Sequence, residues 1–425
     1  MASKRRFGAA VRLASKILLV LVLTFLALEF LLLAFNDLIF HDAFYVFDPD
    51  MGFRVRPYAR YGNQQANEFG FNDRDYPHDR RPNTFRILIL GDSFNWMGGQ
   101  ENNYTALLER RFEQEFGEGR VEIISAGYPQ THTAEQLALL EKYGLQYNPD
   151  LVVVGFYAGN DFFDAHPGRK RIVVGSVPVD VYEGRDFYAT LLGQPLVFRS
   201  RLFLFLREKW TVFKHFSSAR REATAQRRET HSSQQRLLPA PQGTAPQPLR
   251  GSSGESGPPG SPVQSRQKTV SLPTADYLRM LSARMTFTRV DRPPIFEQFE
   301  RYVFDSLIEM RSLLKARGIG FLVAVYPDEI QVDPTLREAL VEYDRRTSSD
   351  YQWDRAQFLL QQWCARNAVE FYDLLSHFRE AHRQGRRLYK RNDSHWNTTG
   401  NRLAAQLLFG VLAPRARQAL EQGHH

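Results

Sequence analysis

A serine, an aspartate and a histidine in this sequence have the types and the spacing needed for nucleophilic catalysis. Ser93 lies in the run Gly-Asp-Ser-Phe at 91–94, and Asp393 and His395 lie in the run Asp-Ser-His-Trp at 393–396. A serine hydroxyl becomes an effective nucleophile when a base accepts its proton, and a carboxylate can fix the tautomer of that base. We therefore predict Ser93 as nucleophile, His395 as base and Asp393 as the orienting carboxylate.

Two more positions could stabilise the oxyanion that forms when a serine attacks an ester. Gly127 ends the run Ser-Ala-Gly at 125–127, and Asn160 lies in Ala-Gly-Asn-Asp at 158–161. The backbone N–H groups of Ser93 and Gly127 and the side-chain amide of Asn160 are donors that can converge on one oxygen. Removal of one such donor costs about 3–4 kcal/mol in a serine protease. We predict an oxyanion hole made by Ser93, Gly127 and Asn160.

Apolar runs directly precede most of these residues and predict the strands that position them. Continuous Val/Ile/Leu runs that alternate with amphipathic segments indicate a parallel sheet covered by helices on both faces. The expected strands span 85–90, 121–124, 151–156, 321–326 and 369–374, and the expected helices span 104–116, 133–145, 296–316, 354–367 and 398–412. The predicted fold is α/β, a three-layer α/β/α sandwich with a parallel, flavodoxin-like sheet of about five strands, and ligands of such sheets bind at the carboxyl ends of the strands.

The four runs, in this order, resemble the four conserved blocks of the SGNH/GDSL hydrolases. The resemblance covers roughly residues 85–164 and 296–412. It implies the same sandwich fold and the same roles for Ser93, Gly127, Asn160 and the Asp/His pair. Each block is short, but four blocks at strand ends are jointly specific.

The sequence departs from the common family pattern at two places. Asp393 stands two residues before His395 rather than three, and Trp396 follows. This Asp-x-His-Trp form resembles the SGNH-like domains of alginate-type polysaccharide O-acetyltransferases, although there the serine follows the Asp/His pair in the chain. The second departure is Ser125, where an asparagine often precedes the block-two glycine; this change weakens a supporting hydrogen bond.

Each block also has a simpler structural explanation. Asp92 and Ser93 are good helix N-caps, Asn160 is a common turn residue, and Asp393 can cap the last helix. A phosphate-binding loop after the first strand is disfavoured, because no Gly-x-Gly-x-x-Gly or Gly-Lys-Ser pattern is present. Their occurrence together favours catalysis over four separate structural explanations.

An apolar run near the N-terminus predicts a membrane-spanning helix at about 17–37. A cleaved signal peptide is the alternative, but its apolar region is typically only about 7–15 residues long. The five basic residues of 1–16 predict a cytoplasmic N-terminus and an extracytoplasmic catalytic domain, periplasmic in a bacterium. Glu29 interrupts the apolar run, either facing a partner helix or standing as a tolerated polar residue.

Charge and cysteine content limit the classes of partner. The net charge is +8, but 1–16 and 217–270 together carry all of the excess, so the folded body offers no basic surface for nucleic acid. Cys364 is the only cysteine, which excludes an intrachain disulfide and a cysteine-based metal cluster. We predict no cofactor and no metal. The expected partners are an acylated carbohydrate or other ester and the membrane; protein partners are not predicted.

Seven segments describe the expected organisation. They are a cytoplasmic basic tail (1–16), a transmembrane anchor (17–37), an irregular lead-in (48–84), the first part of the hydrolase core (85–164), an insertion with a helix near 202–213 (165–216), a disordered linker rich in Pro, Ser and Gly (217–272) and the second part of the core (295–415). Aromatic and arginine residues of 48–82 and 172–213 are candidates for a substrate surface.

The predicted activity is that of an extracytoplasmic serine esterase that removes acyl, chiefly acetyl, groups from carbohydrate. A polysaccharide O-acyltransferase would use the same three residues, with a sugar hydroxyl in place of water. A non-catalytic glycan-binding protein of the cell envelope is a further alternative. The complete Ser/Asp/His set favours an enzyme.

Overall fold

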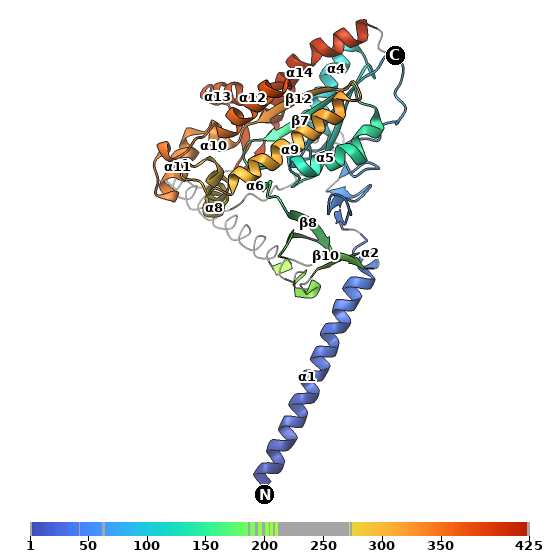
Figure 1. Ribbon diagram of the computed structural model, residues 1–425, viewed down its shortest axis with the longest axis vertical. Helices are drawn as coiled ribbons and strands as arrows, with labels where there is room; N and C mark the ends of the chain where they lie inside the picture. Colours follow the sequence, from blue (N-terminus) through green and yellow to red (C-terminus); the bar gives the residue numbers. More distant parts are fainter. Residues whose placement is uncertain are drawn as a thin grey trace, which may run out of the picture.

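A parallel sheet of five strands forms the centre of the computed structural model (Figure 1). The structure describes residues 2–41, 43–61, 64–185, 188–191, 194–197, 200–203, 205–206, 209–210, 272 and 274–422. The strands are β5 (Phe85–Gly91), β6 (Val121–Gly127), β7 (Leu151–Tyr157), β12 (Gly320–Tyr326) and β13 (Glu370–Asp373). Their spatial order is β13-β12-β7-β5-β6, with every neighbouring pair parallel. This is the flavodoxin-like order, and it reverses between β5 and β7.

Alternate residues of the strands supply two separate cores. On β5, Leu88 and Leu90 belong to one cluster of buried side chains, whereas Ile87 and Ile89 belong to the other. The first face is covered by α5 (Thr133–Lys142), α9 (Phe296–Lys315) and α12 (Arg355–Asn367), and the second by α4 (Tyr104–Phe116), α13 (Leu375–Arg383) and α14 (Thr398–Glu421). The predicted three-layer α/β/α sandwich is therefore confirmed, because side chains alternate between the two faces of a strand.

Most core elements lie within a few residues of their predicted bounds. The helix predicted at 104–116 has these bounds in the structure, and α14 is longer than predicted at its C-terminal end. Two of the longer helices after β12 were not predicted, α11 (Pro334–Asp344) and α13. The remaining short elements are α2 (Asn36–Ile39), η1 (Ser93–Asn95), α3 (Gly99–Asn102), η2 (Gly144–Tyr147), α6 (Asp161–Asp164), η3 (Thr286–Thr288), α10 (Glu329–Val332) and η4 (Ser348–Asp350).

The lead-in segment is more ordered than expected. It forms two small antiparallel pairs, β1 (Tyr45–Val46) with β2 (Arg54–Val55) and β3 (Arg60–Tyr61) with β4 (Gln64–Gln65). Its buried residues, among them Met51, join the core on the α5 face. The lead-in therefore packs onto the sandwich as part of it.

Two hairpins follow α6 in the insertion. They are β8 (Arg169–Val174) with β9 (Val177–Tyr182), and β10 (Tyr188–Leu191) with β11 (Gln194–Val197). Helical residues from Arg201 onward agree with part of the helix expected near 202–213. Apart from Leu272, the predicted linker at 217–272 lies outside the described residues. A helix that was not predicted, α8 (Thr274–Met285), precedes α9.

The N-terminal helix α1 (Ala2–Ala34) extends away from the body (Figure 1). Within Val11–Ala34, an 18-residue window has a mean hydropathy of 2.9, and 6% of that window is buried. By length and composition this helix can cross a membrane, as an anchor or as a signal sequence.

Candidate active site

Ser93 lies immediately after β5, beside the point where the strand order reverses. The Asp92 carboxylate accepts a hydrogen bond from the Phe94 N–H at 2.9 Å and so caps the short helix η1. Gly91 is required here, because a Cβ atom at this position would lie 2.3 Å from Asn95 Oδ1. The turn after the strand therefore holds Ser93 at the carboxyl edge of the sheet.

A hairpin that was not predicted carries the other two residues of the candidate triad. It consists of β14 (Tyr389–Lys390) and β15 (Asp393–Trp396), which are antiparallel. In a strand, residues i and i+2 point to the same side. Asp393 and His395 thus share one side, while the buried Trp396 packs on Phe94 with ring centroids 4.7 Å apart.

The structure brings Ser93, His395 and Asp393 into direct contact. Ser93 Oγ lies 2.7 Å from His395 Nε2, and His395 Nδ1 lies 2.5 Å from Asp393 Oδ1. An ionised carboxylate can only accept a hydrogen bond, so Nδ1 carries the proton and Nε2 is left to accept one from the serine hydroxyl. This is the arrangement that a serine nucleophile and its base require.

The two carboxyl groups beside this chain of contacts differ in their electrostatics. Burial on its own would raise the pKa of Asp393, but the hydrogen bond and charge of His395, together with Lys390, lower it below the usual value. Asp92 has no such strong partner, and burial raises its pKa to about 6. Asp393 is thus favoured as the charged partner of the histidine, while Asp92 serves as a cap.

Buried polar groups support the turn from below. Asn95 Nδ2 donates to the Ile89 carbonyl at 3.0 Å, and Asn95 Oδ1 accepts from the Tyr104 hydroxyl at 2.7 Å. The Tyr326 hydroxyl in turn donates to that of Tyr104 at 3.0 Å. Because buried hydrogen-bonded networks resist distortion, this one fixes η1 relative to β5.

The predicted oxyanion donors occupy different surroundings. Asn160 lines the same cavity as Ser93, and its Nδ2 donates to Asp164 Oδ2 at 2.8 Å. Gly127 pairs with Gly91 at the end of β6, where a Cβ atom would lie 2.5 Å from the Gly91 oxygen. Its carbonyl accepts from Trp96 Nε1 at 2.9 Å. The N–H of Ser125, the departure noted in the sequence, donates to Asp73 at 2.8 Å.

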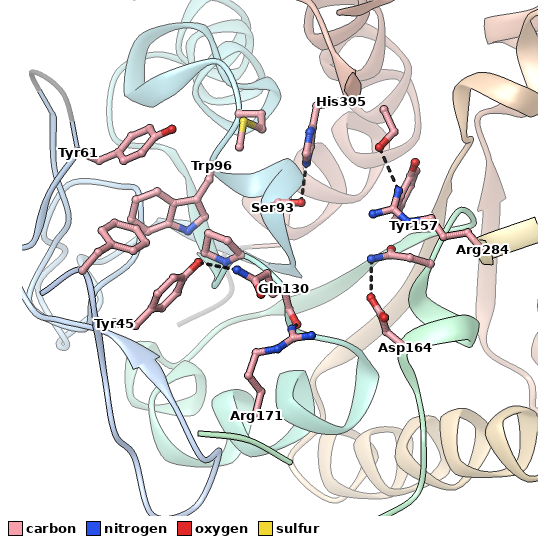
Figure 2. Close-up of a pocket in the computed structure, with 15 residues that line it drawn as sticks. Tyr45, Tyr61, Ser93, Trp96, Gln130, Tyr157, Asp164, Arg171, Arg284 and His395 are labelled. Carbon is pink, nitrogen blue, oxygen red and sulfur yellow. Dashed lines mark hydrogen bonds between the residues drawn. The ribbon is translucent and has the colours of Figure 1, made fainter. Parts of the chain in front are cut away.

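A cavity of about 680 Å³ opens onto Ser93 and His395. Figure 2 shows one side of it lined by aromatic rings and the other by polar and charged side chains. The aromatic wall consists of Phe44, Tyr45, Tyr61 and Trp96. Phe44 contacts each of the other three rings, with centroid distances of 4.8, 5.8 and 5.1 Å in that order.

Several residues of the polar side were not predicted from the sequence. Arg284 of α8 lines the cavity and donates to Ser394 Oγ at 3.1 Å. Asp164, which looks like a loop residue in the sequence, accepts from Asn160 and pairs with Arg169 at 3.4 Å. Arg171 of β8 lines the cavity as well. These residues come to the cavity through contacts between distant parts of the chain. No local sequence motif therefore predicts them.

The described residues contain no group of three or more His, Cys, Asp and Glu side chains arranged to hold a metal ion. His132 is a helix cap: its side chain accepts from the Ala134 N–H, and burial lowers its pKa to about 3.

The second half of the chain matches a known family. Residues 297–425 match the model of the SGNH hydrolase-like domain of the acetyltransferase AlgX. This part of the chain is similar to an SGNH hydrolase-like domain. The matched region contains Asp393 and His395 but not Ser93, which the fold brings to them. The SGNH-like architecture agrees with the observed order of the five strands.

Similar solved structures include esterases at low identity. The acetyl xylan esterase AlAXEase is 13% identical with a TM-score of 0.37, over 77% of this chain and 100% of the other. A catalytic mutant of Axe2, an acetylxylan esterase from Geobacillus stearothermophilus, is 11% identical with a TM-score of 0.35, over 78% and 95%. TesA is 10% identical with a TM-score of 0.34, over 77% and 98%. The similarity to these structures is weak, and no curated protein matches the chain.

Proposed function

We propose that this SGNH-type protein is a serine esterase that removes acyl groups, chiefly acetyl, from carbohydrate. The observation that carries the proposal is the continuous contact from Ser93 through His395 to Asp393. Four separate structural roles for the motifs would not require these side chains to meet. Their meeting across 302 residues of sequence favours a catalytic role.

The proposed reaction has two halves. His395 Nε2 accepts the Ser93 proton as Oγ attacks the ester carbonyl, and the resulting oxyanion is stabilised by the predicted donors, the N–H groups of Ser93 and Gly127 and the amide of Asn160. The C–O bond to the sugar then breaks, and His395 returns the proton to the sugar oxygen. Water next attacks the acyl-serine, with His395 as base, and releases the free acid and Ser93.

The aromatic wall supports carbohydrate as the substrate class. Aromatic rings offer flat apolar surfaces, while the opposite side of the cavity offers arginine, asparagine and carboxylate groups. A sugar ring has apolar C–H faces and hydroxyl edges, which fits a site that combines both kinds of surface.

The membrane anchor and orientation are part of the same proposal. A helix long enough to span a bilayer precedes the body, and the basic residues lie on its N-terminal side. By the positive-inside rule, the catalytic domain would face away from the cytoplasm.

O-acyl transfer to a sugar hydroxyl is a second candidate. The Asp-x-His-Trp spacing and the match of residues 297–425 to an acetyltransferase model favour it. The first half-reaction would be the same, but the acceptor would replace water.

Product analysis separates the two candidates. The purified chain is incubated with an activated acetyl ester, with and without an excess of oligosaccharide, and the products are identified by mass spectrometry. The esterase releases acetate in both cases, whereas predominant acetylated oligosaccharide would reverse the ranking. Failure of Ser93 to react with a fluorophosphonate probe would instead favour a non-catalytic glycan-binding protein.

A further inference from the structure

One polar residue of α1, Glu29, binds a segment of the insertion. Ser200 Oγ donates to the Glu29 carboxylate, as do the N–H groups of Arg201 at 2.9 Å and Leu202 at 3.1 Å. Ser200 Oγ also accepts from the Phe203 N–H at 3.0 Å. Glu29 and Ser200 together satisfy the free N–H groups at the start of a helical segment.

The contact lies on one face of α1, near its C-terminal end. Residues 11–28 of the helix are exposed throughout, whereas Glu29, Leu32, Leu33 and Asn36 are partly or fully buried. This spacing of three and four residues defines one side of a helix. The body therefore covers only the last turns of α1 and leaves the long apolar part free for lipid.

We define the interface segment as the described residues between 200 and 210. They are Ser200, Arg201, Leu202, Phe203, Phe205, Leu206, Lys209 and Trp210. Phe203, Leu206 and Trp210 are 63%, 55% and 58% exposed, although all three are large and apolar. Their spacing of three and four residues places them on one side of a helix.

The opposite side of the segment packs on the protein. Phe205 contacts Phe40 with ring centroids 5.5 Å apart and also packs on the core of the β8–β9 hairpin. Arg201 is buried, and the Glu29 carboxylate opposes the lowering of its pKa by burial. The exposed apolar side is thus presented by a segment held in place from behind.

We propose that the interface segment docks the body on the lipid bilayer, with Glu29 pinning it to the membrane-spanning helix. From Glu29 to Ala34, α1 rises about 7.5 Å at about 1.5 Å per residue. Interfacial helices sit about 5–10 Å deep at the boundary of headgroups and acyl chains, with Trp, Phe and Leu on the buried side. The segment therefore meets the bilayer at the depth where such residues are stabilised.

The same contact accounts for a carboxylate inside an apolar helix. A carboxylate without a partner is costly to place in the apolar part of a bilayer. Three donors from the interface segment offset this cost. Glu29 acts as the attachment point of the segment, which the sequence alone did not predict.

Tryptophan fluorescence tests the docking in the full chain. Trp96, Trp363 and Trp396 are buried and Trp353 is partly buried, so Trp210 is the most exposed tryptophan in the described part of the chain. In vesicles that contain brominated phosphatidylcholine, we expect the lipid to quench the tryptophan fluorescence of the native chain. This quenching should be lost in Trp210→Phe and kept in the control Trp353→Phe. Absence of quenching, or quenching that Trp210→Phe leaves unchanged, would overturn the proposal. If Trp210 is instead protected from quenchers only when the protein is dimeric, the exposed apolar face binds a second copy of the chain, and the docking proposal is wrong.

A second pair of variants tests the role of Glu29. Glu29→Ala should reduce the Trp210 quenching, because the start of the segment loses its acceptor. Thr24→Ala, a change at an exposed polar residue of the same helix, should leave the quenching unchanged. Equal quenching in both variants would refute the pinning.

Discussion

Strand geometry explains why Asp393 and His395 are two residues apart. On β15 this spacing places both side chains on the side that faces Ser93, and the intervening Ser394 is free to accept a hydrogen bond from Arg284. The pairing of residue types was predictable from the sequence. The strand was not, because Asp-Ser before a helix resembles a helix cap.

Replacement of the proposed triad residues should have effects of different size on the rate, because Ser93 is the proposed nucleophile and Asp393 only orients the proposed base. We expect Ser93→Ala to reduce kcat on an activated ester by about 10⁶-fold and Asp393→Asn by about 10⁴-fold, by analogy with a serine protease. Initial rates measured with matched circular dichroism spectra check this. Activity of Ser93→Ala near that of the native chain would remove Ser93 from the mechanism.

Asp92 should make the stability of the protein depend on pH. Burial raises its pKa from 3.8 to about 6, so the folded state holds this proton more tightly than the unfolded state. As pH rises through this window, the unfolded state loses its proton first and the native chain loses stability relative to Asp92→Asn. We expect a relative loss of about 2 kcal/mol in denaturant unfolding between pH of about 4 and about 7.

The variant keeps the cap, because an asparagine oxygen can also accept from the Phe94 N–H. Asp79→Asn, at an exposed position, serves as the control. Its free energy of unfolding should depend on pH in the same way as that of the native chain. If the free energy of unfolding of the native chain and that of Asp92→Asn changed equally with pH, burial of Asp92 would not be the cause of the pH dependence.

At the level of elements, α8 and the β14–β15 hairpin are joined by hydrogen bonds beside the site. Arg284 Nη1 donates to Ser394 Oγ between them, and Asn392 Nδ2 donates to the Leu272 carbonyl just before α8. The sequence did not predict α8, because it directly follows a long polar, proline-rich stretch. Its amphipathic pattern becomes meaningful only once Tyr277 and Leu281 are seen to pack against α10 and α11.

A double-mutant cycle tests whether α8 positions the hairpin. We expect Arg284→Met and Ser394→Ala each to lower kcat/KM by about tenfold, since a hydrogen bond to a charged group contributes about 1.5–3 kcal/mol. The double variant should be no worse than the poorer single variant, because both remove the same contact. Strictly multiplicative losses would show that the two residues act independently.

At the level of the whole molecule, the sandwich was predictable and the cavity was not. The apolar runs predicted the five strands because fully buried parallel strands have a distinct composition. The aromatic wall depends on how the lead-in folds back: Phe44 and Tyr45 precede the segment expected to form it, and the contacts that bring them to Trp96 have no local signal.

The orientation of the whole molecule can be measured in cells. We expect a reporter that is active only after export to be active when fused after residue 425, because the five basic residues of 1–16 keep the N-terminus inside. Replacement of these five residues by glutamine should reduce reporter activity. A reporter that is active only in the cytoplasm would overturn both the localisation and the substrate class.

In the proposed mechanism, the separation of 302 positions between Ser93 and His395 also determines when the chain can first act on an ester. A chain emerging from the ribosome or the export channel presents Ser93 302 positions before His395. Until then Ser93 is an ordinary alcohol beside a half-built sheet, since β12, β13 and the β14–β15 hairpin have yet to emerge. We therefore expect nascent chains that end before His395 to be inert toward the esters around them, and reactivity to appear only once β12, β13 and the β14–β15 hairpin have folded onto β5.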